Sequence, residues 1–339
     1  MRCKLYAMQS PSRTNIASDI AAFSIISKEL SRVKQLIEDQ FSCFASQPEL
    51  HRFLESFNST GGKMLRPGLL LLSGDSVGKL TNRHIQVGAI IEMIHNATLL
   101  HDDVIDNGLQ RRGGATVNSF YGNESAVLLG DFLLSKVFRM CVDLQPEVIE
   151  IIASAAVQTC EGELRQTIRK REWQLSEAEY IEIIADKSAS LFSGSCELGG
   201  LLSGANESEI GLLREFGLNF GIGFQITDDL LDIVGDESKT GKSLGSDVDK
   251  DKMTLAVIHL LRTVDKNERD VIKDRLNNSG QNKEILLSML NRLGSLDYAR
   301  NQVMEFIDKA RRSLSGLKQS EAKTALLGVS EFIADKAGC

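Results

Sequence analysis

The chain has 339 residues, of which 42% are hydrophobic and 25% are charged, and these values are ordinary for a globular protein. The formal net charge of −7 argues against nucleic acid as a partner, and without a long apolar run no transmembrane segment is expected. The six cysteines show neither a CxxC pair nor a spacing typical of zinc sites. We therefore expect reduced, mostly buried thiols in a cytoplasmic protein.

Residues 1–14 lack the apolar core of a secretory signal. We expect a flexible tail there, with a weak transit sequence or a start at Met8 as the alternatives. No linker or composition change divides residues 15–339, so a single domain is expected. Apolar residues recur at helical spacing between Ile16 and Phe44, which predicts the first helix or pair of helices. None of the prolines lies beyond Pro146, and this favours long helices in the rest of the chain.

Residues 58–67 read NSTGGKMLRP, a glycine-containing turn followed by two cations, Lys63 and Arg66. On a first helical turn, residues three apart point the same way. Cations at a helix start suit an anion, although the same residues would also be ordinary in a solvated loop.

The helix predicted next ends in three aspartates, Asp102, Asp103 and Asp106. Asp102 and Asp106 share a helix face, and carboxylates this close repel each other unless a cation lies between them. Mg²⁺ typically takes one or two carboxylates together with substrate phosphates. An arginine pair follows, Arg111 and Arg112, and guanidinium matches phosphate in a bidentate fork.

The remaining elements follow from periodicity and capping. Helices are predicted over about residues 82–106, 127–144, 148–171 and 216–234, with a loop over residues 113–126. A capping box at Ser176 and Glu179 starts another helix. Lys187 lies in that helix among apolar residues, where a charge needs an anionic partner. Residues 253–339 read as further amphipathic helices, with breaks near 277–281 and 294–297.

A second acidic triplet, Asp228, Asp229 and Asp232, repeats the spacing of the first at the end of another apolar helix. A lysine-rich loop follows it. Alone, either triplet could be a solvated acidic turn. Two apolar helices with the same acidic ending can instead face each other across a cavity and bridge several metal ions.

The order of these motifs resembles that of the trans-type polyprenyl diphosphate synthases, from about residue 15 onward. The motifs that carry the resemblance are GGKMLRP, EMIHNATLLHDDVIDNGLQRRG, the Lys187-Ser188 pair, GFQITDDLLD and GKSLGSDVDKDKMTL. The resemblance implies a single all-α domain of antiparallel helices around a deep central cavity, usually in a homodimer. It also implies Mg²⁺-dependent condensation of isopentenyl diphosphate with an allylic diphosphate such as farnesyl diphosphate, with release of pyrophosphate.

The resemblance also assigns residues to roles. The isopentenyl diphosphate site would comprise Lys63, Arg66, His95 and Arg112. The allylic diphosphate site would comprise Arg111, Lys187, Ser188, Gln225 and Lys242. The metal ligands would be Asp102, Asp106 and Asp228, supported by Asp103, Asp229 and Asp232; these six, with Lys187 and Lys242, are the expected catalytic residues. Lys252 matches a lysine near the active-site entrance.

Three positions depart from the family pattern. Asp251 stands where glycine is usual, Ala256 where proline is common, and Met64 where another basic residue is frequent. With these changes the sequence does not determine the closed conformation of the loop. They remove no expected metal ligand or phosphate contact.

Product length depends on the wall below the aspartates. Ala97 and Thr98 lie about one turn before Asp102, where bulky aromatic residues close the tunnel in short-chain members of the family. Both are small, so we expect a medium or long product of about C35–C50, and within this range we favour octaprenyl diphosphate. Phe138 is the candidate floor of the tunnel, although it could also be an ordinary core residue.

Three alternatives stay open at this point. The protein could be a short-chain farnesyl or geranylgeranyl diphosphate synthase. A class I terpene cyclase is disfavoured by the second DDLLD motif and by the Lys63/Arg66 pair. A non-catalytic synthase subunit is disfavoured because all six aspartates are retained.

Overall fold

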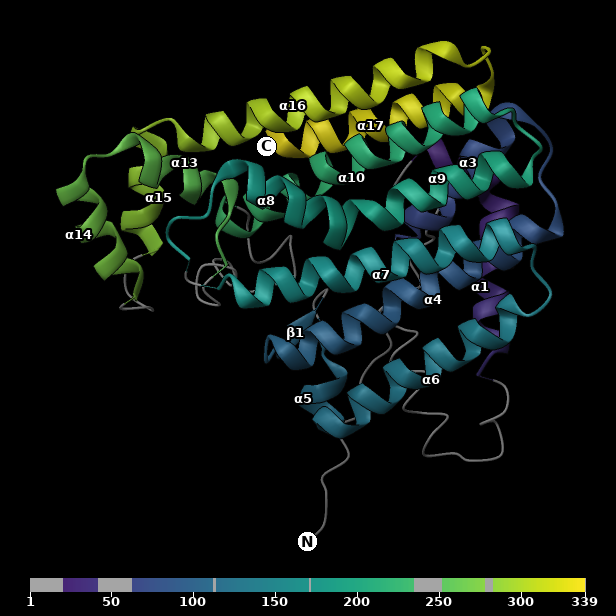
Figure 1. The fold of residues 1–339 in the computed structure, drawn as a ribbon, viewed down its shortest axis with the longest axis horizontal. Coiled ribbons are helices and arrows are strands. Elements are labelled where there is room, and N and C mark those ends of the chain that lie inside the picture. Colours follow the sequence, from purple (N-terminus) through teal and green to yellow (C-terminus); the bar gives the residue numbers. More distant parts are fainter. Residues whose placement is uncertain are drawn as a thin grey trace, which may run out of the picture.

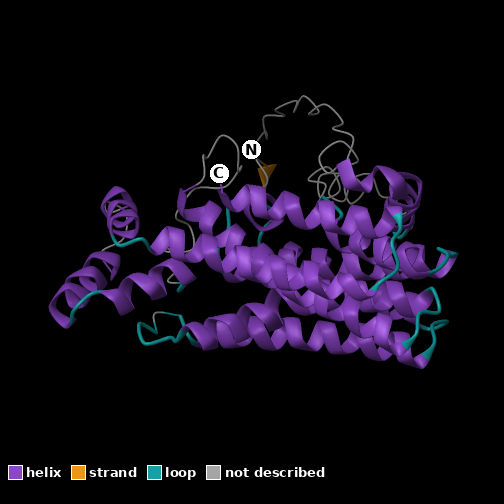
Figure 2. Ribbon diagram, turned by 90° about the horizontal axis from the view of Figure 1, so that it is seen from above, coloured by secondary structure: helices purple, strands orange, loops and turns teal. Residues whose placement is uncertain are grey.

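The computed structural model describes residues 21–41, 63–111, 114–170, 172–234, 252–277 and 283–338. Within these residues the fold is all-α, apart from one two-stranded hairpin, as Figure 2 shows. The helices of the first half are η2 (Ala21–Ile26), α1 (Ser27–Asp39), α3 (Leu65–Val77), α4 (Asn82–Ile105), α5 (Val117–Tyr121), α6 (Asn123–Cys141) and α7 (Pro146–Ile168). Those of the second half are α8 (Glu177–Ile184), the π-helical turn η4 (Ala185–Ala189), α9 (Ser190–Leu202), α10 (Glu207–Val234), α13 (Leu255–Thr263), α14 (Lys266–Asn277), α15 (Lys283–Arg292), α16 (Ser295–Ser313), η5 (Leu314–Gly316) and α17 (Glu321–Gly338). The hairpin pairs β1 (Gln110–Arg111) with β2 (Gly114–Ala115) in antiparallel register.

The long helices run side by side, with α16 and α17 along one side and α6 along the other (Figure 1). Helix α10 packs against α9 and α16, α9 packs against α3, and α4 packs against α6. Helices α14 and α15 project from one end of the bundle (Figure 1). None of the described helices is both long enough and apolar enough to cross a membrane.

The core explains why these segments fold as helices. Leu69, Leu70, Leu71 and Leu72 are all fully buried, so α3 is apolar on every side and lies inside the bundle. Between α9 and α10, the rings of Phe192 and Phe220 meet edge to face with their centroids 5.4 Å apart. One continuous cluster of buried apolar side chains includes residues from α1 to α17.

Several predicted elements are confirmed. Helix α4 begins and ends within a residue of the predicted helix over 82–106. Helix α7 begins two residues before the predicted helix over 148–171 and ends three residues before its predicted end. The capping box of α8 is present, since the Glu179 backbone N–H donates to the Ser176 hydroxyl and the Glu179 side chain accepts from the Ser176 backbone. Gly294, with φ of 67°, separates α15 from α16 at the predicted break.

The predicted loop over residues 113–126 is wrong in part, because it contains β2, α5 and the start of α6. The Thr116 side chain accepts a hydrogen bond from the Ser119 backbone at the start of α5 and donates to the Gly108 carbonyl at 2.7 Å. Such short elements depend on local side-chain hydrogen bonds and have no apolar period to reveal them. The cysteine expectation is also only partly right: Cys196 is buried, Cys141 is half-buried and Cys160 is exposed, while the other three lie outside the described residues.

Candidate active site

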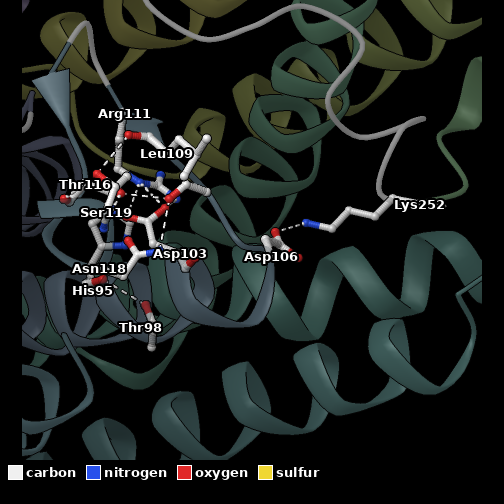
Figure 3. A network of polar contacts seen from close by, with 11 residues as sticks. His95, Thr98, Asp103, Asp106, Leu109, Arg111, Thr116, Asn118, Ser119 and Lys252 are labelled. Atoms are coloured by element: carbon white, nitrogen blue, oxygen red, sulfur yellow. Dashed lines mark hydrogen bonds and ion pairs between the residues drawn. The ribbon is translucent and has the colours of Figure 1, made fainter. Parts of the chain in front are cut away.

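The first acidic triplet lies where α4 ends. Asp103 is buried and is held by a guanidinium fork: Arg111 Nε donates to Asp103 Oδ1 at 3.0 Å, and Arg111 Nη2 donates to the same oxygen at 2.8 Å. Arg111 comes from β1, so the hairpin turns the chain back onto the end of α4 (Figure 3). The Asn118 side chain supports this turn by donating to the Asp103 carbonyl at 3.1 Å.

Asp106, which caps the C-terminus of α4, meets cations from two other parts of the chain. Lys252 Nζ donates to Asp106 Oδ2 at 2.5 Å, on the side of α4 away from the hairpin (Figure 3). Lys170, just after α7, places its Nζ 3.6 Å from Asp106 Oδ1. Three distant segments of the chain therefore meet at this carboxylate.

The second triplet ends α10 and is held differently. Asp229 is buried; its Oδ2 accepts from the Tyr180 hydroxyl at 2.6 Å, and its Oδ1 accepts from Gln225 Nε2 at 2.8 Å. The Ser188 hydroxyl in turn donates to Gln225 Oε1 at 2.6 Å. Asp232 is also buried, and Asp228 is half-buried.

Lys187 lies in the π-helical turn η4 between α8 and α9, and short π-helical segments of this kind occur frequently at functional sites. Its ammonium forms an ion pair with Glu163 and donates to Gln166 Oε1 at 2.8 Å, so the predicted need for an anionic partner is confirmed. Gly162 makes the contact possible, because a side chain there would collide with the Lys187 backbone. The turn thus lies directly against α7.

The electrostatics link the two triplets. The pKa of Asp102 is raised to about 6: burial is the largest cause, Lys187 and other nearby cations oppose it, and Glu163 adds to the rise. Burial alone would lower the pKa of Arg111, but the hydrogen bond to Asp103 and the charges of Asp102 and Asp228 outweigh it and raise this pKa. The charges of carboxylates on both α4 and α10 therefore act on one guanidinium, that of Arg111.

These residues fit a hard divalent cation that is shared with a ligand. Among the described residues, no group of three or more His, Cys, Asp or Glu side chains forms a ready-made metal cage. The raised pKa of Asp102 nevertheless marks a carboxylate whose charge lacks full compensation. Mg²⁺ commonly binds through one or two carboxylates and completes its shell with water and phosphate oxygens.

The structure corrects the expected geometry of Lys63 and Arg66. Helix α3 begins at Leu65, after Met64 with a left-handed φ of 50°, so Lys63 precedes the helix and does not share a turn with Arg66. Lys63 Nζ lies 5.6 Å from the ring centroid of Phe332 on α17.

Arg66 instead enters the interior. It is only 8% exposed, and its guanidinium carbon lies 4.2 Å from the ring centroid of Phe192 on α9. His95 is half-buried on α4. The remaining two expected phosphate contacts, Arg112 and Lys242, lie outside the described residues.

The product-length residues divide into two groups. Ala97 is fully buried, and Thr98 is half-buried with its hydroxyl donating to the His95 carbonyl at 2.8 Å. Phe138 is 72% exposed, so within one chain it cannot form the floor of a tunnel, and that expectation is wrong. The physical reason is helical phase: Phe138 lies two turns after Asp131, which is itself on the exposed face of α6.

Sequence reasoning missed several residues of this site. The residues without a predicted role are Glu163, Gln166, Lys170 and Tyr180. Glu163 and Gln166 are three apart on one face of α7, and this spacing, set beside the partner that Lys187 needs, could have indicated them. Lys170 stands in a basic run typical of a solvated face, and no local signal distinguishes it.

Comparison with known proteins identifies the family of this chain. The family model described as polyprenyl synthetase matches residues 47–293. An octaprenyl diphosphate synthase of Escherichia coli (strain K12) is 34% identical over 81% of this chain and 86% of that protein. A geranylgeranyl diphosphate synthase of Sulfolobus acidocaldarius is 34% identical over 83% of this chain and 87% of that protein. A crystal structure of a polyprenyl synthase from Caulobacter crescentus, complexed with calcium and isoprenyl diphosphate, superposes with a TM-score of 0.86 at 28% identity, covering 97% of this chain and 99% of that one.

The chain therefore belongs to the polyprenyl synthetase family and has its all-α isoprenoid synthase fold. It is an enzyme of the trans-prenyltransferase class. The relatives differ in the length of the product that their names state, so membership of the family does not by itself fix the product of this chain.

Proposed function

We propose that this enzyme condenses isopentenyl diphosphate with an allylic diphosphate in a Mg²⁺-dependent reaction that yields a medium or long all-trans polyprenyl diphosphate. The observation that carries the proposal is the position of Arg111, whose guanidinium binds Asp103 and lies close enough to Asp102 and Asp228 for their charges to raise its pKa. Carboxylates from both triplets near one guanidinium suit a ligand that brings both negative phosphates and metal ions.

The allylic diphosphate would lie between the two triplets. Its contacts would be Arg111, Lys187, Ser188, Gln225 and Lys242, and the ligands of its metal ions would be Asp102, Asp106 and Asp228. Mg²⁺, when bound there, would offset the negative charge that builds on the departing pyrophosphate. Lys187 suits this role because Glu163 and Gln166 hold its ammonium beside Asp102.

Isopentenyl diphosphate would be held by Lys63, Arg66, His95 and Arg112. Its double bond would attack the allylic cation, and loss of a proton to the departing pyrophosphate would restore an allylic diphosphate one C5 unit longer. The cation needs surroundings that exclude water, and the apolar faces of α4 and α10 below the aspartates meet that need.

For the product we propose a length of about C35–C50, with octaprenyl diphosphate foremost. The support is the small side chain of Ala97, which stands one turn below Asp102 in place of a bulky aromatic residue.

We also propose a homodimer. Large apolar side chains are exposed on α6, at its C-terminal cap and on α7, at Leu128, Phe138, Val142, Val157, Leu164 and Ile168. Exposed apolar side chains are common at protein interfaces, and a second copy of the chain would cover these. Sedimentation of the purified protein tests this. The extent of the domain, residues 15–339, and the cytoplasmic location stay predictions from the sequence.

The decisive experiment incubates the purified protein with Mg²⁺, labelled isopentenyl diphosphate and farnesyl diphosphate, and sizes the products by chromatography. Products of C35–C50 are expected. Products that stop at C15 or C20 would replace the long-chain proposal with a short-chain synthase. Cyclic hydrocarbons would indicate a terpene cyclase, and the absence of any elongation would refute the proposed reaction.

A further inference from the structure

A chain of hydrogen bonds connects α8, α10 and the π-helical turn. It runs from the Tyr180 hydroxyl to Asp229, where Gln225 also donates, and from Ser188 to Gln225. All three donor–acceptor distances lie between 2.6 and 2.8 Å. Tyr180 is only 2% exposed, so its phenol is a buried support and not a surface on which substrate could bind.

The carboxylate fixes the direction of the whole chain. Both oxygens of Asp229 accept hydrogen bonds, from Tyr180 and from Gln225, so Gln225 presents its NH₂ group to this carboxylate. The Gln225 carbonyl oxygen must then point toward Ser188, whose hydroxyl donates to it. The orientation of both side chains is thereby set by Asp229.

Tyr180 holds Asp229 in the position that this requires. Its hydroxyl takes one carboxylate oxygen and leaves the other for Gln225. Bonds from a neutral donor to a carboxylate are short and strong, and loss of one at a buried carboxylate leaves the oxygen without that donor. Without the phenol hydroxyl, Asp229 loses one of the donors that fix its carboxylate, and the acceptor of the Gln225 amide is held less firmly.

We propose that Tyr180 is a positioning residue for the allylic diphosphate subsite, acting through Asp229 on Gln225 and Ser188. This inference depends on the proposed function, in which Gln225 and Ser188 contact the allylic diphosphate. The role predicts an effect on the allylic substrate and none on isopentenyl diphosphate. The proposed contacts of isopentenyl diphosphate lie outside this hydrogen-bond chain, since Lys63 contacts Phe332 on α17 and Arg66 contacts Phe192 on α9.

The test compares Tyr180→Phe with Tyr298→Phe. The two are matched, because the Tyr298 hydroxyl also donates to a carboxylate, that of Glu177 in the first turn of α8, at 2.8 Å. Both substitutions remove one phenol hydroxyl that tethers α8 and preserve the ring. Steady-state kinetics with Mg²⁺ should show KM for farnesyl diphosphate raised about tenfold in Tyr180→Phe, with KM for isopentenyl diphosphate unchanged. Tyr298→Phe should change neither KM.

A binding measurement supplies a readout that does not require turnover. Calorimetry with Mg²⁺ and farnesyl thiolodiphosphate, an allylic analogue with a poor leaving group, should give a Kd about tenfold higher for Tyr180→Phe than for the unaltered protein. If the unaltered protein binds the analogue but does not elongate, the proposed reaction fails while this Kd still decides the role of Tyr180. If it does not bind the analogue at all, both proposals fail.

A double substitution tests the route through Gln225. In a Gln225→Ala background, Tyr180→Phe should raise the Kd for the analogue no further, because the group it positions is already absent. Full additivity, an equal rise in both KM values, or the same effect from Tyr298→Phe would overturn the proposal. If thermal melting shows that Tyr180→Phe is not folded, Asp229→Asn replaces it, because an amide can donate as well as accept hydrogen bonds. Asp229→Asn should weaken binding of the allylic analogue and leave binding of isopentenyl diphosphate unchanged.

Discussion

The two acidic triplets have the same spacing, yet the structure holds them by different means. The central aspartate of the first, Asp103, is held by the charged fork of Arg111. Its counterpart in the second, Asp229, is held by two neutral donors, Tyr180 and Gln225. A charged partner can be exchanged for a metal ion or a phosphate, whereas neutral buried donors fix one geometry. The comparison indicates an adaptable wall at the end of α4 and a rigid wall at the end of α10.

Removing a proposed metal ligand should have the largest effect, and it should be similar on both walls. Asp102→Ala and Asp228→Ala are each expected to lower kcat at least a hundredfold, because the charge developing on pyrophosphate would lose its metal contact. Titration of activity with Mg²⁺ checks this, and chelation of the metal should abolish the activity of the unaltered protein. A variant of either kind with near-normal kcat would contradict the paired site.

The walls also differ one turn below the triplets, where α4 carries Ala97 and Thr98 while α10 carries Gly223 and Phe224. Ala97→Phe should close the path along α4 and shorten the product by several C5 units. Chromatographic sizing of the products measures this, with a thermal melt to detect overpacking at this fully buried position. Products of unchanged length would show that the chain does not grow past Ala97.

Replacing the charged fork should weaken the first wall in a salt-dependent manner. Arg111→Lys keeps the charge but cannot fork onto Asp103, so kcat/KM for the allylic substrate should fall about tenfold. The deficit should change with ionic strength, whereas that of Tyr180→Phe, which removes a neutral donor, should not. Identical salt profiles for the two variants would break the distinction between the walls.

A smaller effect is expected from the turn that joins the walls. Glu163→Gln removes the charge that pairs with Lys187, and we expect KM for the allylic substrate to rise about three- to fivefold, with a loss of stability of about 1–2 kcal/mol. Glu161→Gln on the exposed face of the same helix is the matched control and should stay within about 0.5 kcal/mol of the unaltered protein. Equal denaturation curves and equal kinetics for the two variants would show that Glu163 has no role in the active site.

Features that depend on neighbours along the chain could be predicted from the amino-acid sequence alone. Three such features could be identified without a structure: the helical period, the capping box at Ser176 and the repeated spacing of the aspartates. The same holds for the demand that Lys187 have an anionic partner, since a charge among apolar residues requires one.

Which side chains meet across helices, and which face of a helix points to the core, became clear only from the three-dimensional packing. Glu163 reaches Lys187, and Tyr180 reaches Asp229, across helix contacts that no sequence spacing encodes. The left-handed backbone at Met64 separated Lys63 from the turn of Arg66, and the packing of α6 on α4 turned Phe138 outward. The physical reason is that period fixes the angle between side chains on one helix, whereas the side that faces the core depends on how all the helices pack together.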